Sequence, residues 1–144
     1  MHLFYENIAP YMLKHWMGSF FTRDPFLNDQ PYVLNNKQWN EIGIEMETAR
    51  KSIPTSFGRP SRNIVLHHNG YKAEEWSSWI TLYSLPLLKD RLPEKYLKGW
   101  FYFVKAVKLC QKRTLSLYDQ DDIRNLLLQF YKHYERYLYL FFII

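Results

Sequence analysis

The chain is 144 residues long, carries a formal net charge of +5 and contains one cysteine. This length predicts a single domain over residues 1–144, and the 47% share of hydrophobic residues excludes a generally disordered chain. Because Cys110 is the only cysteine, neither an intrachain disulfide framework nor a cysteine-based zinc site can form, which indicates an intracellular, reducing location.

Helical patterns separated by proline or glycine begin with the first residues. Apolar side chains recur at helical spacing over residues 2–17, where Pro10 is expected to start or bend the helix and Gly18 to end it. After a loop, Asn36 is expected to cap a helix over residues 37–53. The first third of the chain is therefore predicted to hold two helices joined by a loop.

The middle of the chain combines a basic loop with two helices. The loop is predicted over residues 54–71, which hold arginine, histidine, glycine and proline but no acidic residue. A buried helix with two tryptophans should follow over residues 71–90, kinked or ended by Pro86. The next helix is expected over residues 94–113, with a proline in its first turn.

The last helix is expected over residues 120–140, capped by Ser116 or Asp119. No stretch alternates with period two, so the fold is predicted to be all-α, with about five helices in an irregular bundle. Residues 36–137 would form a helical C-terminal region. The apolar tail at 138–144 is too short to span a membrane, and no membrane partner is expected.

A row of lysines marks the helix predicted over residues 94–113. At 100° per residue the lysines fall on one side, and the apolar residues Leu97, Trp100, Phe101, Val104 and Val107 are assigned to the other side. No acidic residue occurs between Glu94 and Asp119. A stripe of one sign suits a phosphate backbone, and the alternative is a solvated lysine face on a core-packed helix, for which lysine is the commonest residue. The candidate nucleic-acid-binding lysines are Lys95, Lys98, Lys105, Lys108 and Lys112.

The basic loop supplies two further candidates for DNA contact. Arg59 and Arg62 lie among glycine, proline and serine, a setting in which arginine side chains can reach phosphates. The alternative is an ordinary surface loop that crosses the bundle.

A metal site has only a weak candidate. His2 and Glu6 are four residues apart and would share a helix face, a spacing that can hold a divalent metal. Two ligands are too few for a free-standing metal enzyme, so no metal site and no cofactor are expected.

The order of motifs resembles a known family. The blocks "MHLFYENIAPYMLKHWMGSF", "WNEIGIEMETARKSIPTSFGRP", "YKAEEWSSWITLYSLPLL", "LPEKYLKGWFYFVKAVKLC" and "LLLQFYKHYERY" form a collinear series over about residues 1–137. This series resembles the region at and beyond the end of the catalytic domain in CACTA-type transposases, notably transposase-like proteins abundant in fungal genomes.

The resemblance carries expectations about fold and activity. Residues 1–20 would be a remnant of the edge of a ribonuclease-H-like core, and Glu6 would correspond to the last acid of its catalytic triad. That core cleaves DNA with two metal ions held by several carboxylates. Because the aspartate–proline pair that usually precedes "MHL" is missing, a truncated, inactive fragment is expected, nuclear if it functions, with divalent metal only in the intact ancestral enzyme.

An interaction module is the alternative function. Aromatic residues make up 19% of the chain, a high share that indicates either a bulky core or surfaces that contact a partner. A face around Leu3, Tyr11, Trp16 and Phe20 is expected to be exposed, where it would support self-association or docking to a transposase core.

Overall fold

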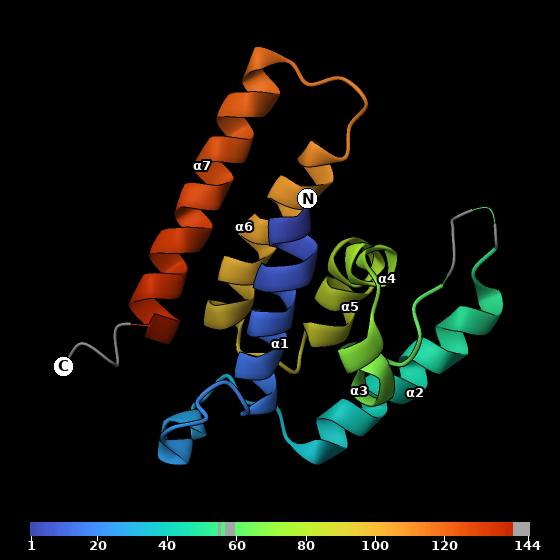
Figure 1. The fold of residues 1–144 in the computed structure, drawn as a ribbon, viewed down its shortest axis with the longest axis vertical. Helices are drawn as coiled ribbons and strands as arrows, with labels where there is room; N and C mark the ends of the chain where they lie inside the picture. The colour runs from blue at the N-terminus through green and yellow to red at the C-terminus, as the bar shows by residue number, and fades with distance from the viewer. Residues whose placement is uncertain (55, 57–59, 140–144) are drawn as a thin grey trace. The chain divides into compact units, whose positions relative to one another are not determined.

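Two helical units make up the computed structural model, which describes residues 1–54, 56 and 60–139 (Figure 1). The first unit covers Met1–Leu92 and the second Pro93–Ile144. The described residues are helical with connecting turns and contain no strand, which confirms the all-α prediction. The prediction of a single domain over residues 1–144 stays a prediction.

The first unit opens with a helical run that ends at a glycine. A π-helical segment, η1 (Leu3–Ile8), continues into α1 (Ala9–Met17). Gly18 follows with φ +69°, and its backbone N–H donates to carbonyls of the last helical turn. A left-handed residue at this position closes a helix at low cost only when it is glycine, so the predicted stop at Gly18 is confirmed.

Two prolines lie within helical runs, each just after a π-helical turn. The Ala9 N–H donates to the Phe4 carbonyl just before Pro10. In the same way, the Ser84 N–H donates to the Trp79 carbonyl two residues before Pro86. Proline lacks an N–H and its ring clashes with the carbonyl four residues earlier, so a locally widened turn accommodates it.

Pro86 therefore does not end its helix, contrary to one of the two outcomes expected for it. The run passes through α4 (Ala73–Ser78), η5 (Trp79–Tyr83) and α5 (Ser84–Leu88). The turn beyond α5 contains Asp90, whose φ of +64° lies in the left-handed region.

A capping box starts α2 (Asn36–Ser52) one residue earlier than the sequence pattern suggested. Asn35 accepts from the Gln38 N–H at 2.8 Å, and the Gln38 side chain accepts from the Asn35 N–H at 3.0 Å. The expected cap at Asn36 was wrong, because only Asn35 has a glutamine three residues later to reciprocate the bond.

The second half of the predicted loop over 54–71 is helical. It contains α3 (Ile64–His67) and the 3₁₀ turn η4 (His68–Gly70). Asn63 starts α3 by accepting from the Val65 N–H at 3.0 Å. Ile64 is fully buried and ties this short helix to the core. An isolated turn of this length carries no strong sequence signal, so tertiary packing decides it.

Large apolar side chains from every main helix fill the core of the first unit. A further one-turn helix, η2 (Pro25–Asn28), lies in the connection before α2. Trp16 and Trp79 are almost completely buried. Trp76 is 4% exposed, so both tryptophans of the helix after the loop are buried, as expected. The other side chains with no more than 1% exposure include Leu13, Ile42, Met46, Ile64, Ile80 and Leu88.

The second unit is a helical hairpin of α6 (Glu94–Cys110) and α7 (Leu117–Tyr134), which continues into η6 (Glu135–Tyr139) (Figure 1). Ser116 accepts from the Asp119 N–H, and Asp119 accepts from the Ser116 N–H. Both residues named as alternative caps therefore act together in one capping box. The Phe103 and Phe130 rings, 5.0 Å apart, join the two helices.

A glycine sets how closely the two helices of the hairpin approach. A Cβ atom built on Gly99 would lie 2.1 Å from Nδ1 of His133. The other ring nitrogen of His133 lies 2.6 Å from the Lys95 carbonyl oxygen, a hydrogen bond that holds the imidazole against α6. Burial lowers the pKa of His133, which favours the neutral ring that fits this contact.

Candidate nucleic-acid interface

The lysines of α6 lie on its exposed side, opposite a buried apolar face. Gly99, Trp100, Phe103, Val104, Ala106 and Val107 are buried, whereas all four lysines on the helix are exposed. Lys98, Lys105 and Lys108 are spaced by seven and three residues, which places them on one side of the helix. The single-sided arrangement agrees with the pattern in the sequence.

Phe101 was predicted on the apolar side of α6, but it lies on the side that carries the lysines. Its side chain is 46% exposed. Phe101 follows Lys98 by three residues and precedes Lys105 by four, and these are the spacings that bring side chains together on a helix. The spacing of Phe101 from Lys98 and Lys105 in the sequence already indicated this position. We call the set of Lys98, Phe101, Lys105 and Lys108 the α6 basic face.

Carboxylates do not neutralise the α6 basic face. In the part of the chain that the structure describes, no ion pair joins Lys98, Lys105 or Lys108 to an acidic side chain. Glu94 precedes Lys98 by one helical turn without an ion pair between them. Three adjacent cations therefore face solvent around one exposed aromatic ring.

The two remaining candidate lysines have other contacts. Lys112 lies beyond the last residue of α6, and its Nζ is 2.6 Å from Oδ1 of Asp119. Hydrogen bonds from Lys112 and Ser116 lower the pKa of Asp119 to about 2. Lys95 places its ammonium over the Tyr96 and Tyr137 rings, at 4.9 and 4.7 Å from their centroids. Lys112 thus supports the α6–α7 turn, and Lys95 borders the α6 basic face.

Arg62 belongs to the first unit and makes a structural ion pair. Its Nε lies 2.7 Å from Oε1 of Glu75 and its terminal nitrogen 2.9 Å from Oε2, a two-pronged contact. The same terminal nitrogen donates to the Gly70 carbonyl at 2.8 Å. With its donors engaged in this way, Arg62 fastens the segment before α3 to α4, and this geometry does not present it as a free phosphate ligand.

Glu75, the partner of Arg62, was not predicted from the sequence to have a role. Its side chain is 6% exposed, and it also accepts from the Lys72 N–H at 3.0 Å. The hydrogen bond from Arg62 is the largest cause that lowers the pKa of Glu75, to about 2. The hydroxyl of Tyr71 donates to the Arg62 carbonyl and extends the network. Arg59, the other arginine candidate, lies outside the described residues.

The candidate metal ligands His2 and Glu6 contact each other. Nδ1 of His2 lies 2.5 Å from Oε2 of Glu6, and both side chains are exposed. Among the residues the structure describes, no group of three or more histidine, cysteine, aspartate or glutamate side chains is placed to hold a metal ion. The expected spacing is present, but it produces a surface ion pair without a third ligand.

The face expected to be exposed near the N-terminus is only partly so. Leu3 and Tyr11 are 61% and 51% exposed, but Trp16 is 1% exposed and belongs to the core. Phe20 stacks on the buried His15, with ring centroids 3.8 Å apart. The expectation for Trp16 was wrong, because the helix turns this ring inward.

Comparison of the chain with protein-family models, with curated proteins and with solved structures finds no match in any of the three. Within the described part of the chain, none of the helices is both long and apolar enough to cross a membrane.

Proposed function

We propose that the second unit binds nucleic acid through the α6 basic face, without sequence preference. The observation that carries the proposal is the row of three exposed lysines without carboxylate partners around the exposed ring of Phe101. Lysine ammonium groups attract phosphates as point charges and read no base edges. The binding is therefore expected to be electrostatic and weak.

The geometry of α6 fits a short length of backbone. Lys98 and Lys108 are ten residues apart, which corresponds to about 15 Å along a helix. Such a span covers only a few phosphates, so about three ion contacts are expected. For a single strand, three neutralised phosphates give a slope of about −2 when the logarithm of the association constant is plotted against that of the salt concentration.

Phe101 favours a single strand over a duplex. An aromatic ring among lysines can stack with an unpaired base while the lysines follow the backbone, and each such stack contributes about 1–3 kcal/mol. In a duplex the bases are already stacked with one another. A single-stranded oligonucleotide should therefore bind more tightly than a duplex of the same length, and Phe101→Ala should remove the difference.

Fluorescence anisotropy with a labelled oligothymidylate, measured over a range of salt concentrations, tests the proposal. The triple variant Lys98→Gln, Lys105→Gln, Lys108→Gln should lose binding. The control variant changes the same number of exposed lysines in the first unit, Lys37→Gln, Lys51→Gln, Lys89→Gln, so the net charge is equal. An equal loss in both variants, or an affinity that does not depend on salt, would refute a localised interface.

We also propose that the chain derives from a CACTA-type transposase and has no strand-cleaving activity of its own. The collinear motif series over residues 1–137 supports the derivation. A single carboxylate such as Glu6 cannot organise two metal ions. Incubation with supercoiled plasmid and Mg²⁺ or Mn²⁺ should leave the plasmid intact. Nicking that disappears in Glu6→Gln would overturn this expectation.

A second candidate function, self-association, is favoured by α7. Leu117, Leu128 and Tyr131 are 78%, 47% and 55% exposed, and their spacing of eleven and three residues places them on one side of the helix. We expect light scattering at micromolar concentration to detect a dimer if this stripe pairs with a second copy, and Leu128→Glu to return it to a monomer. A monomer at all concentrations would exclude this function.

A further inference from the structure

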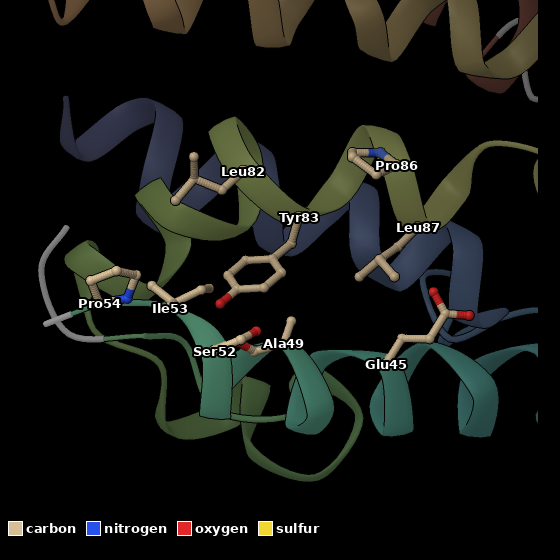
Figure 2. Close-up of a pocket in the computed structure, with 9 residues that line it drawn as sticks. All are labelled: Glu45, Ala49, Ser52, Ile53, Pro54, Leu82, Tyr83, Pro86 and Leu87. Atoms are coloured by element: carbon tan, nitrogen blue, oxygen red, sulfur yellow. The ribbon is translucent and has the colours of Figure 1, made fainter.

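An apolar groove lies in the first unit between the end of α2 and the helical run η5–α5 (Figure 2). Its volume is about 450 Å³, within the range of sites that hold small organic molecules. Most of the lining is aliphatic and comes from both sides, from Ala49, Ile53 and Pro54 and from Leu82, Pro86 and Leu87. An aliphatic lining of this kind favours an apolar ligand body.

A single buried hydroxyl interrupts this apolar surface. Figure 2 shows the ring of Tyr83 crossing the groove from η5 toward Ser52 and Ile53 at the end of α2. Tyr83 is 6% exposed, and its hydroxyl has no hydrogen-bond partner among the residues that the structure describes. The Ser52 hydroxyl at the end of α2 donates to the Ala49 carbonyl at 3.0 Å and forms no hydrogen bond with Tyr83.

A buried hydroxyl without a partner is unusual, since leaving it unsatisfied costs free energy. Its phenolic proton needs an acceptor, which a ligand in the groove can provide. Burial raises the pKa of Tyr83, so the hydroxyl keeps its proton near neutral pH and is able to donate it. Arg50 lies on α2 between Ala49 and Ser52, which both line the groove, and its positive charge lowers the pKa of the same hydroxyl.

The charges at the two ends of the groove differ. Glu45 lines the end away from the Tyr83 hydroxyl, and Arg91 pairs with its carboxylate. Arg50 provides positive charge on α2, directly after the groove-lining Ala49, and has no ion pair with a carboxylate among the described residues. An acceptor group that is also negatively charged therefore fits the Tyr83 end better than a neutral or cationic one.

We propose that this groove binds a small apolar carboxylate, with its aromatic or aliphatic body between Ala49 and Leu87 and its carboxylate toward the Tyr83 hydroxyl and Arg50. The hydroxyl is covered from solvent, so binding also requires the Ile53 side chain to move aside. Ile53 directly follows the last helical residue of α2, Ser52, and its backbone N–H remains bonded to the Ala49 carbonyl.

Methyl NMR spectra of the full chain, titrated with 2-naphthoate, provide the test. We expect shifts concentrated on the methyl groups of Ala49, Ile53, Leu82 and Leu87. The probe 2-naphthylmethylamine has the same apolar body and the opposite charge, and it should bind about tenfold more weakly, since a charged hydrogen bond contributes about 1.5–3 kcal/mol. Arg50→Gln should reduce this preference.

Tyr83→Phe separates a ligand-binding role from a structural one. The variant should weaken 2-naphthoate binding about tenfold. Its thermal stability should be equal to or higher than that of the unaltered chain, because the change removes a buried hydroxyl that has no partner. Tyr118→Phe is the matched control, since Tyr118 is 84% exposed and lies outside the groove. It should change neither binding nor stability.

Three outcomes would overturn the proposal. The first is an absence of methyl shifts at millimolar 2-naphthoate. The second is a set of shifts spread over both units, which indicates general adsorption of an aromatic anion to a basic protein. The third is an equal affinity of Tyr83→Phe and the unaltered chain for 2-naphthoate.

Discussion

Glu75→Gln tests the buried ion pair that holds the segment before α3 against α4. In the folded chain the carboxylate is 6% exposed and has a pKa of about 2, against an ordinary value of 4.5. Each tenfold change in an acid constant corresponds to about 1.4 kcal/mol, so the folded state favours the charged carboxylate by about 3 kcal/mol. Glutamine keeps the shape but turns a donor toward Arg62, so we expect a loss of about 3 kcal/mol in the free energy of unfolding.

Urea unfolding followed by tryptophan fluorescence measures this loss, since four of the five tryptophans lie in the first unit. The adjacent Glu74→Gln is the control, because Glu74 is exposed. The folded-state pKa of Glu75 is depressed, so its contribution is present above about pH 4.5 and disappears as the pH falls toward 2. A Glu75→Gln effect equal to that of Glu74→Gln at neutral pH, or one that persists unchanged at pH 2, would refute the reasoning.

Three further changes test other packing contacts. Gly99→Ala should lower the free energy of unfolding of the α6–α7 hairpin by more than 1 kcal/mol, although alanine has the better helix propensity. In a His133→Ala background this loss should disappear, and circular dichroism during urea unfolding measures both effects. Burial lowers the pKa of His15 to about 4, so the free energy of unfolding should fall by up to about 3 kcal/mol from pH 6.5 to 4, and His15→Phe should abolish this pH dependence. Asp90→Ala should cost about 1 kcal/mol in thermal unfolding whereas Asp90→Gly should cost less, because φ at this position is +64°.

The candidate interface on α6 was largely readable from the sequence. A helical period places Lys98, Lys105 and Lys108 on one side of α6, and the structure leaves them exposed there. The same helical spacing places Phe101 beside these lysines, although it was predicted in the core because aromatic residues are usually buried. Lys112 differs because α6 ends at Cys110, and the lysine then turns to Asp119.

The sequence alone determined the helical class, the stop at Gly18, the start of α2 to within one residue, and Ser116 as one of two alternative caps of α7. These features depend on residues close together in the chain: a glycine that tolerates a positive φ, and capping side chains three positions from their partners. Only the tertiary structure decided the pairing of Arg62 with Glu75, the contact of Gly99 with His133 and the helical path through Pro86. The first two contacts join residues far apart in the sequence, and the helix through Pro86 is held by the packing of the whole helical run. A short-range pattern in the sequence does not say which distant residue or packing surface will offset such a local cost.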